Sequence, residues 1–195
     1  MLHKTRDTTA QMWSVYHSSR GATKHLGLDR TNAEDTGSNY YQDTEPTSSV
    51  FSVGSESSTN HNGAAMVTYL WSEVKGYSKF GSYTGNGSTN GTFVYTGFKP
   101  AWVVIKRTDA SANWVLLDNK RDPFNGMATV LNPDDNAADN DMTDGSGNKV
   151  LDMLSNGFKI RDEYAWFGAS DATYIYMAFA ESPFVNSNGV PTNAR

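Results

Sequence analysis

An internal repeat constrains the fold of this chain more than any other feature of its sequence. The segment Asp7–Tyr16 matches Asp109–Leu117, and Ala64–Glu73 matches Ala172–Glu181. Between these segments, Phe51 and Val53 answer Phe158 and Ile160. The second copy is slightly longer in its polar middle, where a surface loop accepts extra residues. The chain therefore carries two copies of one module.

The first copy is expected to be incomplete. Residues 77–102 precede the matching segment of the second copy and have no counterpart before the first. Missing strands leave open sheet edges, which proteins usually cover or pair. We expect the second copy or a neighbouring subunit to supply these strands. The predicted organisation is an incomplete module over residues 1–75, a complete module over 76–182 and an extended tail over 183–195.

The composition favours short strands over helices. Of the 195 residues, 73 are Ser, Thr, Asn or Gly, which are poor helix formers, and only 19% are charged. Aromatic and β-branched runs such as Thr92–Thr96 and Tyr174–Phe179 have strand length, and Asn-Gly pairs between the runs suit tight turns. Helical turns are expected only near Thr31–Asp35 and Val150–Leu154. The pattern predicts an all-β antiparallel sandwich.

Several function classes are disfavoured by the same totals. Cysteine is absent, the net charge is −5 and the basic residues are scattered, so we expect neither thiolate chemistry nor nucleic-acid binding. No apolar run approaches the ~20 residues that span a bilayer, and no signal peptide is recognised at the N-terminus. We therefore predict no membrane insertion, and no motif indicates a cofactor.

Four segments carry a family resemblance, namely Phe80–Gly87, Phe93–Asp109, Leu154–Arg161 and Tyr174–Phe184. They resemble a concanavalin A-like β-sandwich module that recurs in tail-fibre and other virion proteins of marine bacteriophages. The resemblance implies a jelly-roll fold of the lectin and glucanase type. It also implies a structural or adhesive role on the virion surface, after assembly in the host cytoplasm.

The function expected from this resemblance is non-enzymatic. A tail-fibre or appendage component would mediate assembly and attachment to host-surface glycans. Its partners would be other virion proteins and further copies of the chain, plausibly in a trimer. The alternative is a decoration protein that stabilises the capsid or tail. A more remote alternative is a polysaccharide depolymerase, because Glu73 and Glu181 occupy the same repeat position and paired carboxylates can cleave glycosidic bonds.

Aromatic residues beside polar turns are the candidate glycan-binding residues. Flat rings next to amides and hydroxyls suit the apolar faces and hydroxyl rims of sugars. The candidates are Tyr40, Tyr41, Tyr83, Tyr164 and Trp166. The competing interpretation is that most of these rings close the core or an oligomer interface. Trp13, Trp71, Trp114 and Phe179 recur at repeat positions and are expected in the core.

Metal binding has only weak support in the sequence. Asp139, Asp141 and Asp144 could converge on Ca²⁺ in one loop, but the spacing departs from an EF-hand and a solvated loop is the favoured interpretation. His3, His17, His25 and His61 lack the close pairing of a histidine metal site and are interpreted as surface or satisfied side chains.

Overall fold

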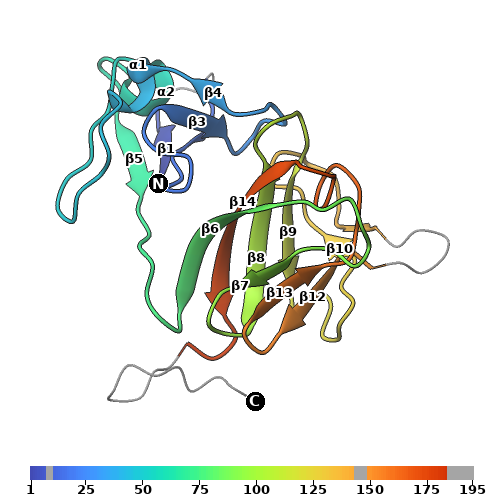
Figure 1. The fold of residues 1–195 in the computed structure, drawn as a ribbon. Helices are drawn as coiled ribbons and strands as arrows, with labels where there is room; N and C mark the ends of the chain where they lie inside the picture. Colours follow the sequence, from blue (N-terminus) through green and yellow to red (C-terminus); the bar gives the residue numbers. More distant parts are fainter. Residues whose placement is uncertain (8–10, 143–148, 184–195) are drawn as a thin grey trace. The chain divides into compact units, whose positions relative to one another are not determined.

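The fold is taken from a computed structural model that describes residues 1–7, 11–142 and 149–183 (Figure 1). The chain divides into two compact units, Met1–Trp71 and Ser72–Arg195, here called unit 1 and unit 2. Antiparallel strands predominate in both units, which confirms the prediction of an all-β antiparallel protein. The predicted tail lies, from residue 184 onward, outside the described residues.

Unit 1 is built on one five-stranded sheet with the order β4-β3-β2-β1-β5. Its strands are β1 (Leu2–Thr5), β2 (Ser14–Val15), β3 (Lys24–Gly27), β4 (Asp35–Thr36) and β5 (Met66–Tyr69). Two helices of one turn each, α1 (Ser38–Tyr41) and α2 (Ser57–Asn60), lie between β4 and β5 in the chain.

The core of unit 1 is small and rich in tyrosine. Tyr16, Tyr40 and Tyr41 are buried together with Ala22, and the rings of Tyr16 and Tyr41 meet edge to face with centroids 5.5 Å apart. Aromatic pairs favour this geometry because the positive ring edge faces the negative ring face. Helix α1 therefore contributes two aromatic anchors to the sheet although it is only one turn long.

The described residues of unit 2 form three antiparallel sheets. The largest has the order β6-β14-β8-β9, the second β12-β13-β7, and the third pairs β10 with β11. The bounds are β6 (Ser78–Thr84), β7 (Phe93–Tyr95), β8 (Pro100–Arg107), β9 (Trp114–Asp118), β10 (Thr129–Val130), β11 (Asn140–Asp141), β12 (Leu151–Leu154), β13 (Gly157–Ile160) and β14 (Thr173–Ala180).

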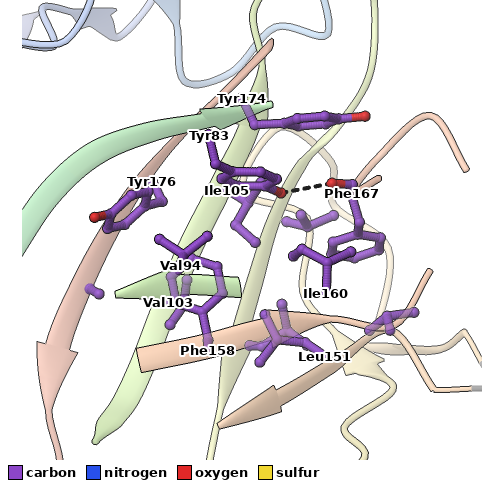
Figure 2. Close-up of a cluster of buried hydrophobic side chains, with 14 of the residues drawn as sticks. Tyr83, Val94, Val103, Ile105, Leu151, Phe158, Ile160, Phe167, Tyr174 and Tyr176 are labelled. Atoms are coloured by element: carbon purple, nitrogen blue, oxygen red, sulfur yellow. Dashed lines mark hydrogen bonds between the residues drawn. The ribbon is translucent and has the colours of Figure 1, made fainter. Parts of the chain in front are cut away.

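The main core of unit 2 lies between its two larger sheets. Figure 2 shows Ile105 and Tyr176 of the four-stranded sheet on one side and Phe158 and Val94 of the three-stranded sheet on the other. Because successive strand residues point to opposite faces, Tyr174, Tyr176 and Ala178 of β14 all enter this core. The two sheets thus share one hydrophobic layer.

The strand pairing of unit 1 matches that of unit 2 at the positions that the sequence aligns. Strand β1 pairs with β5 so that Lys4 faces Val67, and β8 pairs with β14 so that Lys106 faces Ile175. The pairs β1–β2 and β8–β9 also correspond, as do β3–β4 and β10–β11.

Side-chain hydrogen bonds repeat along with the strand pairing. Asp29 accepts the backbone N–H of Trp13 at 3.0 Å, and Asp134 accepts that of Trp114 at 3.1 Å. A second corresponding pair of bonds lies at the ends of the β1–β5 and β8–β14 pairs. Asp7 accepts the backbone N–H of Ala65, and Asp109 accepts the backbone N–H of Thr173. The corresponding aspartates thus bind equivalent backbone groups in the two units.

Other positions aligned by the sequence differ in structure. Phe158 lies in β13 and is fully buried, whereas Phe51 lies outside any strand and is 36% exposed. Strand β13 pairs with β12 and β7, and no strand of the described part of unit 1 takes those places. Trp71, predicted in the core, is 40% exposed because β5 ends at Tyr69.

The two expected helical turns are wrong. Leu151–Leu154 forms β12, since its apolar side chains alternate into the core and the strand pairs with β13 across a tight turn. Residues 31–35 form no helix, and α1 begins only at Ser38.

Truncating Phe158 tests the shared core. Phe158→Ala removes a fully buried ring that meets Tyr83 and Tyr176 edge to face, so we expect unit 2 to lose about 3–5 kcal/mol of unfolding free energy. Equilibrium urea unfolding measures the loss. Phe124→Ala, at an exposed phenylalanine of the same unit, should change stability by no more than ~0.5 kcal/mol. Equal effects of the two variants would contradict this assignment of the core.

Candidate functional site

A pocket of about 360 Å³ opens on unit 2 beside the turn that follows β13. Its lining combines aromatic, charged and hydroxyl side chains from three segments of the unit. The lining residues are Thr89, Met142, Arg161, Asp162, Glu163, Tyr164, Ala165, Trp166 and Phe167. Of the predicted glycan-binding residues, Tyr164 and Trp166 are therefore brought together here.

The aromatic side chains of the pocket differ in how firmly they are held. Tyr164 is 68% exposed, whereas Trp166 is half-buried and packs against the core of unit 2. Phe167 is fully buried. The pocket thus offers one free ring, one ring fixed by packing and an apolar floor, which suits a flat ligand that is partly apolar.

Two buried tyrosines anchor the loop that carries these aromatics. The Tyr83 hydroxyl donates to the carbonyl oxygen of Phe167 at 2.8 Å, which Figure 2 shows as a dashed line, and the Tyr174 hydroxyl donates to that of Ala165 at 2.9 Å. The two phenol rings stack with centroids 4.9 Å apart. Burial raises the pKa of Tyr83 well above its ordinary value, so this hydroxyl stays protonated and remains a donor.

The loop is also a tight turn closed by its own backbone. The carbonyl oxygen of Tyr164 accepts the N–H groups of Phe167, Gly168 and Ala169, and Asp162 accepts the N–H of Tyr164 at 2.7 Å. Gly168 is required here, since a Cβ at this position would lie 1.9 Å from the carbonyl oxygen of Asp162. The backbone of the pocket loop is therefore fixed from both ends.

The charged residues of the pocket have separate tasks. Arg161 forms an ion pair with Asp152, with Nε and Oδ2 2.6 Å apart, so its guanidinium is held from the side of β12. Asp162 binds the backbone of the turn through one carboxylate oxygen. Glu163 is exposed next to Tyr164. Carboxylate oxygens at this rim can accept hydrogen bonds from ligand hydroxyls.

The other three predicted glycan-binding residues are buried, so the predictions for them are wrong. Tyr40 and Tyr41 belong to the core of unit 1, where they are 8% and 1% exposed. Tyr83 is 7% exposed and lies in the core of unit 2. Their rings pack against other side chains and cannot stack on a sugar. Tyr83 nevertheless acts on the site indirectly, because it holds the pocket loop.

The acidic loop does not gather its carboxylates in the part of the chain that the structure describes. Asp139 lies 3.5 Å from Arg121 in an ion pair, and Asp141 is exposed in β11. Asp144 lies outside the described residues. Among residues 1–7, 11–142 and 149–183, no group of three or more His, Asp or Glu side chains could hold a metal ion.

Glu73 and Glu181 are each bound to a lysine. Glu73 pairs with Lys79 and Glu181 with Lys99, both at 2.9 Å, and each glutamate also accepts an N–H group through its other oxygen. Both carboxylates thus take part in structural contacts, although their N–H partners differ: the backbone of Phe80 for Glu73 and the side chain of Asn119 for Glu181. Within the described ranges, no helix is long and apolar enough to cross a membrane.

Sequence reasoning missed the polar part of the pocket. Thr89 lies in the glycine-rich turn after β6, and Arg161, Asp162 and Glu163 directly precede Tyr164. The adjacency of three charged residues and two aromatics was a usable signal. The position of Thr89 beside these residues could not be predicted from local sequence. It depends on a contact between two distant loops, in which the N–H of Gly87 donates to the carbonyl oxygen of Gly168.

The chain belongs to the family described as Domain of unknown function (DUF7483), whose model matches residues 1–183. The match spans both units, so the family domain includes the two together. No curated protein and no solved structure matches the chain.

Removing the Tyr83 hydroxyl should loosen the pocket loop without opening the core. Tyr83→Phe leaves the carbonyl oxygen of Phe167 without its partner, at a cost of about 1–3 kcal/mol. We expect faster amide hydrogen exchange over residues 162–169, measured by mass spectrometry. Tyr95→Phe, at an exposed tyrosine of β7, is the matched control and should leave this exchange unchanged. Unchanged exchange in Tyr83→Phe would show that the loop does not depend on this bond.

Proposed function

We propose that this protein is a non-enzymatic structural component of a bacteriophage virion, exposed on the particle, that attaches to host-surface glycans through the pocket of unit 2. The tail-fibre or appendage role and the other virion proteins as partners come from the sequence resemblance. The observation that supports glycan attachment is the pairing of Tyr164 and Trp166 beside carboxylates in one pocket.

The chemistry of this pocket suits a sugar in two ways. The exposed ring of Tyr164 can stack on the apolar face of a pyranose, and the carboxylates of Asp162 and Glu163 can accept hydrogen bonds from its hydroxyls. Its size fits one or two sugar rings, because pockets for small ligands have volumes of roughly 300–1,000 Å³.

The finer fold assignment is part of the proposal. We propose that both units are copies of one concanavalin A-like jelly-roll module, although no described strand of unit 1 is equivalent to β6, β7, β12 or β13. The corresponding registers of β1–β5 and β8–β14 support this, as do the paired bonds of Asp29 and Asp134.

The open edge of β5 supports a homo-oligomer, and the trimer comes from the resemblance to fibre proteins alone. In unit 2, β14 is paired on both sides, with β8 and with β6. Its counterpart β5 pairs with β1 alone among the described strands. The backbone N–H of Arg6 donates to the carbonyl oxygen of Ala65, so Ala65 is a residue of β5 that faces β1 with its hydrogen-bonding groups. Because these groups alternate along an antiparallel strand, the N–H groups of Met66 and Thr68 point toward the open edge. A strand of a neighbouring copy would satisfy these groups.

Glycan binding is tested directly by truncating the exposed ring. A glycan array should identify a bound sugar, and titration calorimetry with that sugar should show about tenfold weaker binding for Tyr164→Ala, since loss of a stacking ring costs roughly 0.5–1.5 kcal/mol beyond area. Tyr95→Ala, which removes an equally exposed tyrosine elsewhere on unit 2, should bind like the native protein. An array without signal, or equal binding by both variants, would refute this site.

The oligomer is tested at the β5 edge. Met66→Pro removes an edge N–H without removing a bond to β1, so it should shift the mass measured by light scattering from oligomer to monomer. Ser82→Pro is the matched comparison at β6, the edge strand of unit 2, because the bonds Ala180 N–H to Tyr77 O and Gly85 N–H to Ala172 O direct the Ser82 N–H away from β14, and it should leave the mass unchanged. A native protein that is monomeric at all concentrations tested would rule the oligomer out.

A further inference from the structure

Unit 1 buries two imidazoles where unit 2 buries aliphatic side chains. His3 is 0% exposed and His25 is 4% exposed. At the corresponding positions of the matching strands, unit 2 has Ile105 and Val130, both fully buried. The correspondence follows from the strand register. His3 of β1 pairs with Thr68 of β5, as Ile105 of β8 pairs with Tyr176 of β14. His25 of β3 pairs with Asp35 of β4, as Val130 of β10 pairs with Asn140 of β11.

The two imidazoles have no means of carrying a charge inside unit 1. The Nδ1 atom of His3 lies 3.0 Å from the Thr68 hydroxyl, while its Nε2 atom is buried without a hydrogen-bond partner. The Nε2 atom of His25 is also buried without a partner, and its ring lies flat on that of Tyr40 with centroids 3.7 Å apart. A protonated imidazole needs acceptors at both nitrogens, and these sites do not supply them.

We propose that unit 1 is an acid-labile module: protonation of His3 and His25 in mildly acidic solution opens its sheet, while unit 2 remains folded. Each imidazole is stable in the core only in its neutral form. In the unfolded chain, both rings are solvated and accept a proton freely. Acid therefore favours the open form of unit 1 by mass action.

The groups around His25 only partly oppose this effect. Asp35 on β4 faces it across the strand pair, Tyr40 on α1 covers its ring, and His3 on β1 acts as a like charge once protonated. Burial lowers the pKa of His25 to about 4, and the attraction of Asp35 is too small to reverse this. Burial also raises the pKa of Tyr40 to about 12, so that phenol stays neutral.

The groups around His3 do not favour its charged form. Tyr41 on α1 lies near its ring, and the amino group of Met1 repels a proton on it. Strand β5 presents the hydroxyl of Thr68, and α2, which packs on β1, contains only Ser, Thr and Asn. Burial, followed by the Met1 charge, lowers the pKa of His3 to about 4.

The direction of the pH dependence follows from these values. Both pKa values are lower in the folded state than the ~6.5 of a free imidazole, so the histidine contribution to stability is complete above pH 6.5 and is lost as the pH falls from there toward 4. Burial also lowers the pKa of the Met1 amino group to about 6, which adds a smaller loss that begins near pH 8. Each histidine lowers the folding constant about tenfold per pH unit in this window. At pH 5, the two together lower it about a thousandfold.

Hydrogen exchange of the full chain at pH 7.5 and pH 5.0 tests the proposal, with exposure times scaled for the intrinsic pH dependence of amide exchange. Peptides from β1 to β5 should lose protection at pH 5.0 by up to about a thousandfold, whereas peptides from β8 and β14 should keep theirs. Unchanged protection of unit 1, or an equal loss in both units, would overturn the proposal.

Variants built from unit 2 identify the responsible groups. The double substitution His3→Ile and His25→Val introduces the residues that unit 2 carries and should remove most of the pH dependence, leaving the part due to the Met1 amino group, whose pKa burial lowers to about 6. His17→Gln, at a half-exposed histidine of unit 1, should retain it. If the double variant does not fold, NMR titration of the native histidines decides instead. Two imidazoles should stay neutral for as long as the signals of folded unit 1 persist, and titration of all four near pH 6.5 in the folded protein would overturn the proposal.

Discussion

The stacked pair of Tyr83 and Tyr174 is the interaction on which the site of this protein depends. The register of β6 against β14 places these residues opposite each other, and their rings stack within the core. Each hydroxyl then reaches a carbonyl oxygen of the loop that carries Tyr164 and Trp166. A slip of β6 by one residue would turn the Tyr83 ring to the other face of the sheet, away from Tyr174, and would release the loop from its hydroxyl. The pocket is thus a consequence of strand pairing.

The two units show how one pairing scheme can enclose different interiors. In unit 2, a second sheet supplies Phe158 and Leu151 to a core of aromatic and aliphatic side chains. In unit 1, α1 and α2 take part instead, and the interior contains His3 and His25. Ladder hydrogen bonds are indifferent to side-chain polarity, so the pairing persists while the interior changes. Stability and its dependence on pH are set by the interior.

Local sequence was sufficient for the strands and insufficient for burial. The run Thr92–Thr96 contains β7 and the run Tyr174–Phe179 lies within β14, because β-branched and aromatic residues bounded by turn residues leave few alternatives. Tyr83 and Tyr164 both stand beside polar turn residues, yet one is buried and the other exposed. Tyr83 is buried because its ring packs against Phe158 and Tyr174, which are distant from it in the chain, and no local pattern encodes those contacts.

In the pocket loop, the residues that fix the backbone differ from those that would contact a ligand under the proposed function. Tyr83, Tyr174 and Gly168 fix its backbone from inside, through groups that no ligand touches. Glu163 and Tyr164 point outward and make no contribution to the core. Substitutions at these two positions therefore change the surface offered to a ligand at little cost in stability. A loop held in this way can change its specificity while the fold stays constant, which is the property that a recognition surface requires.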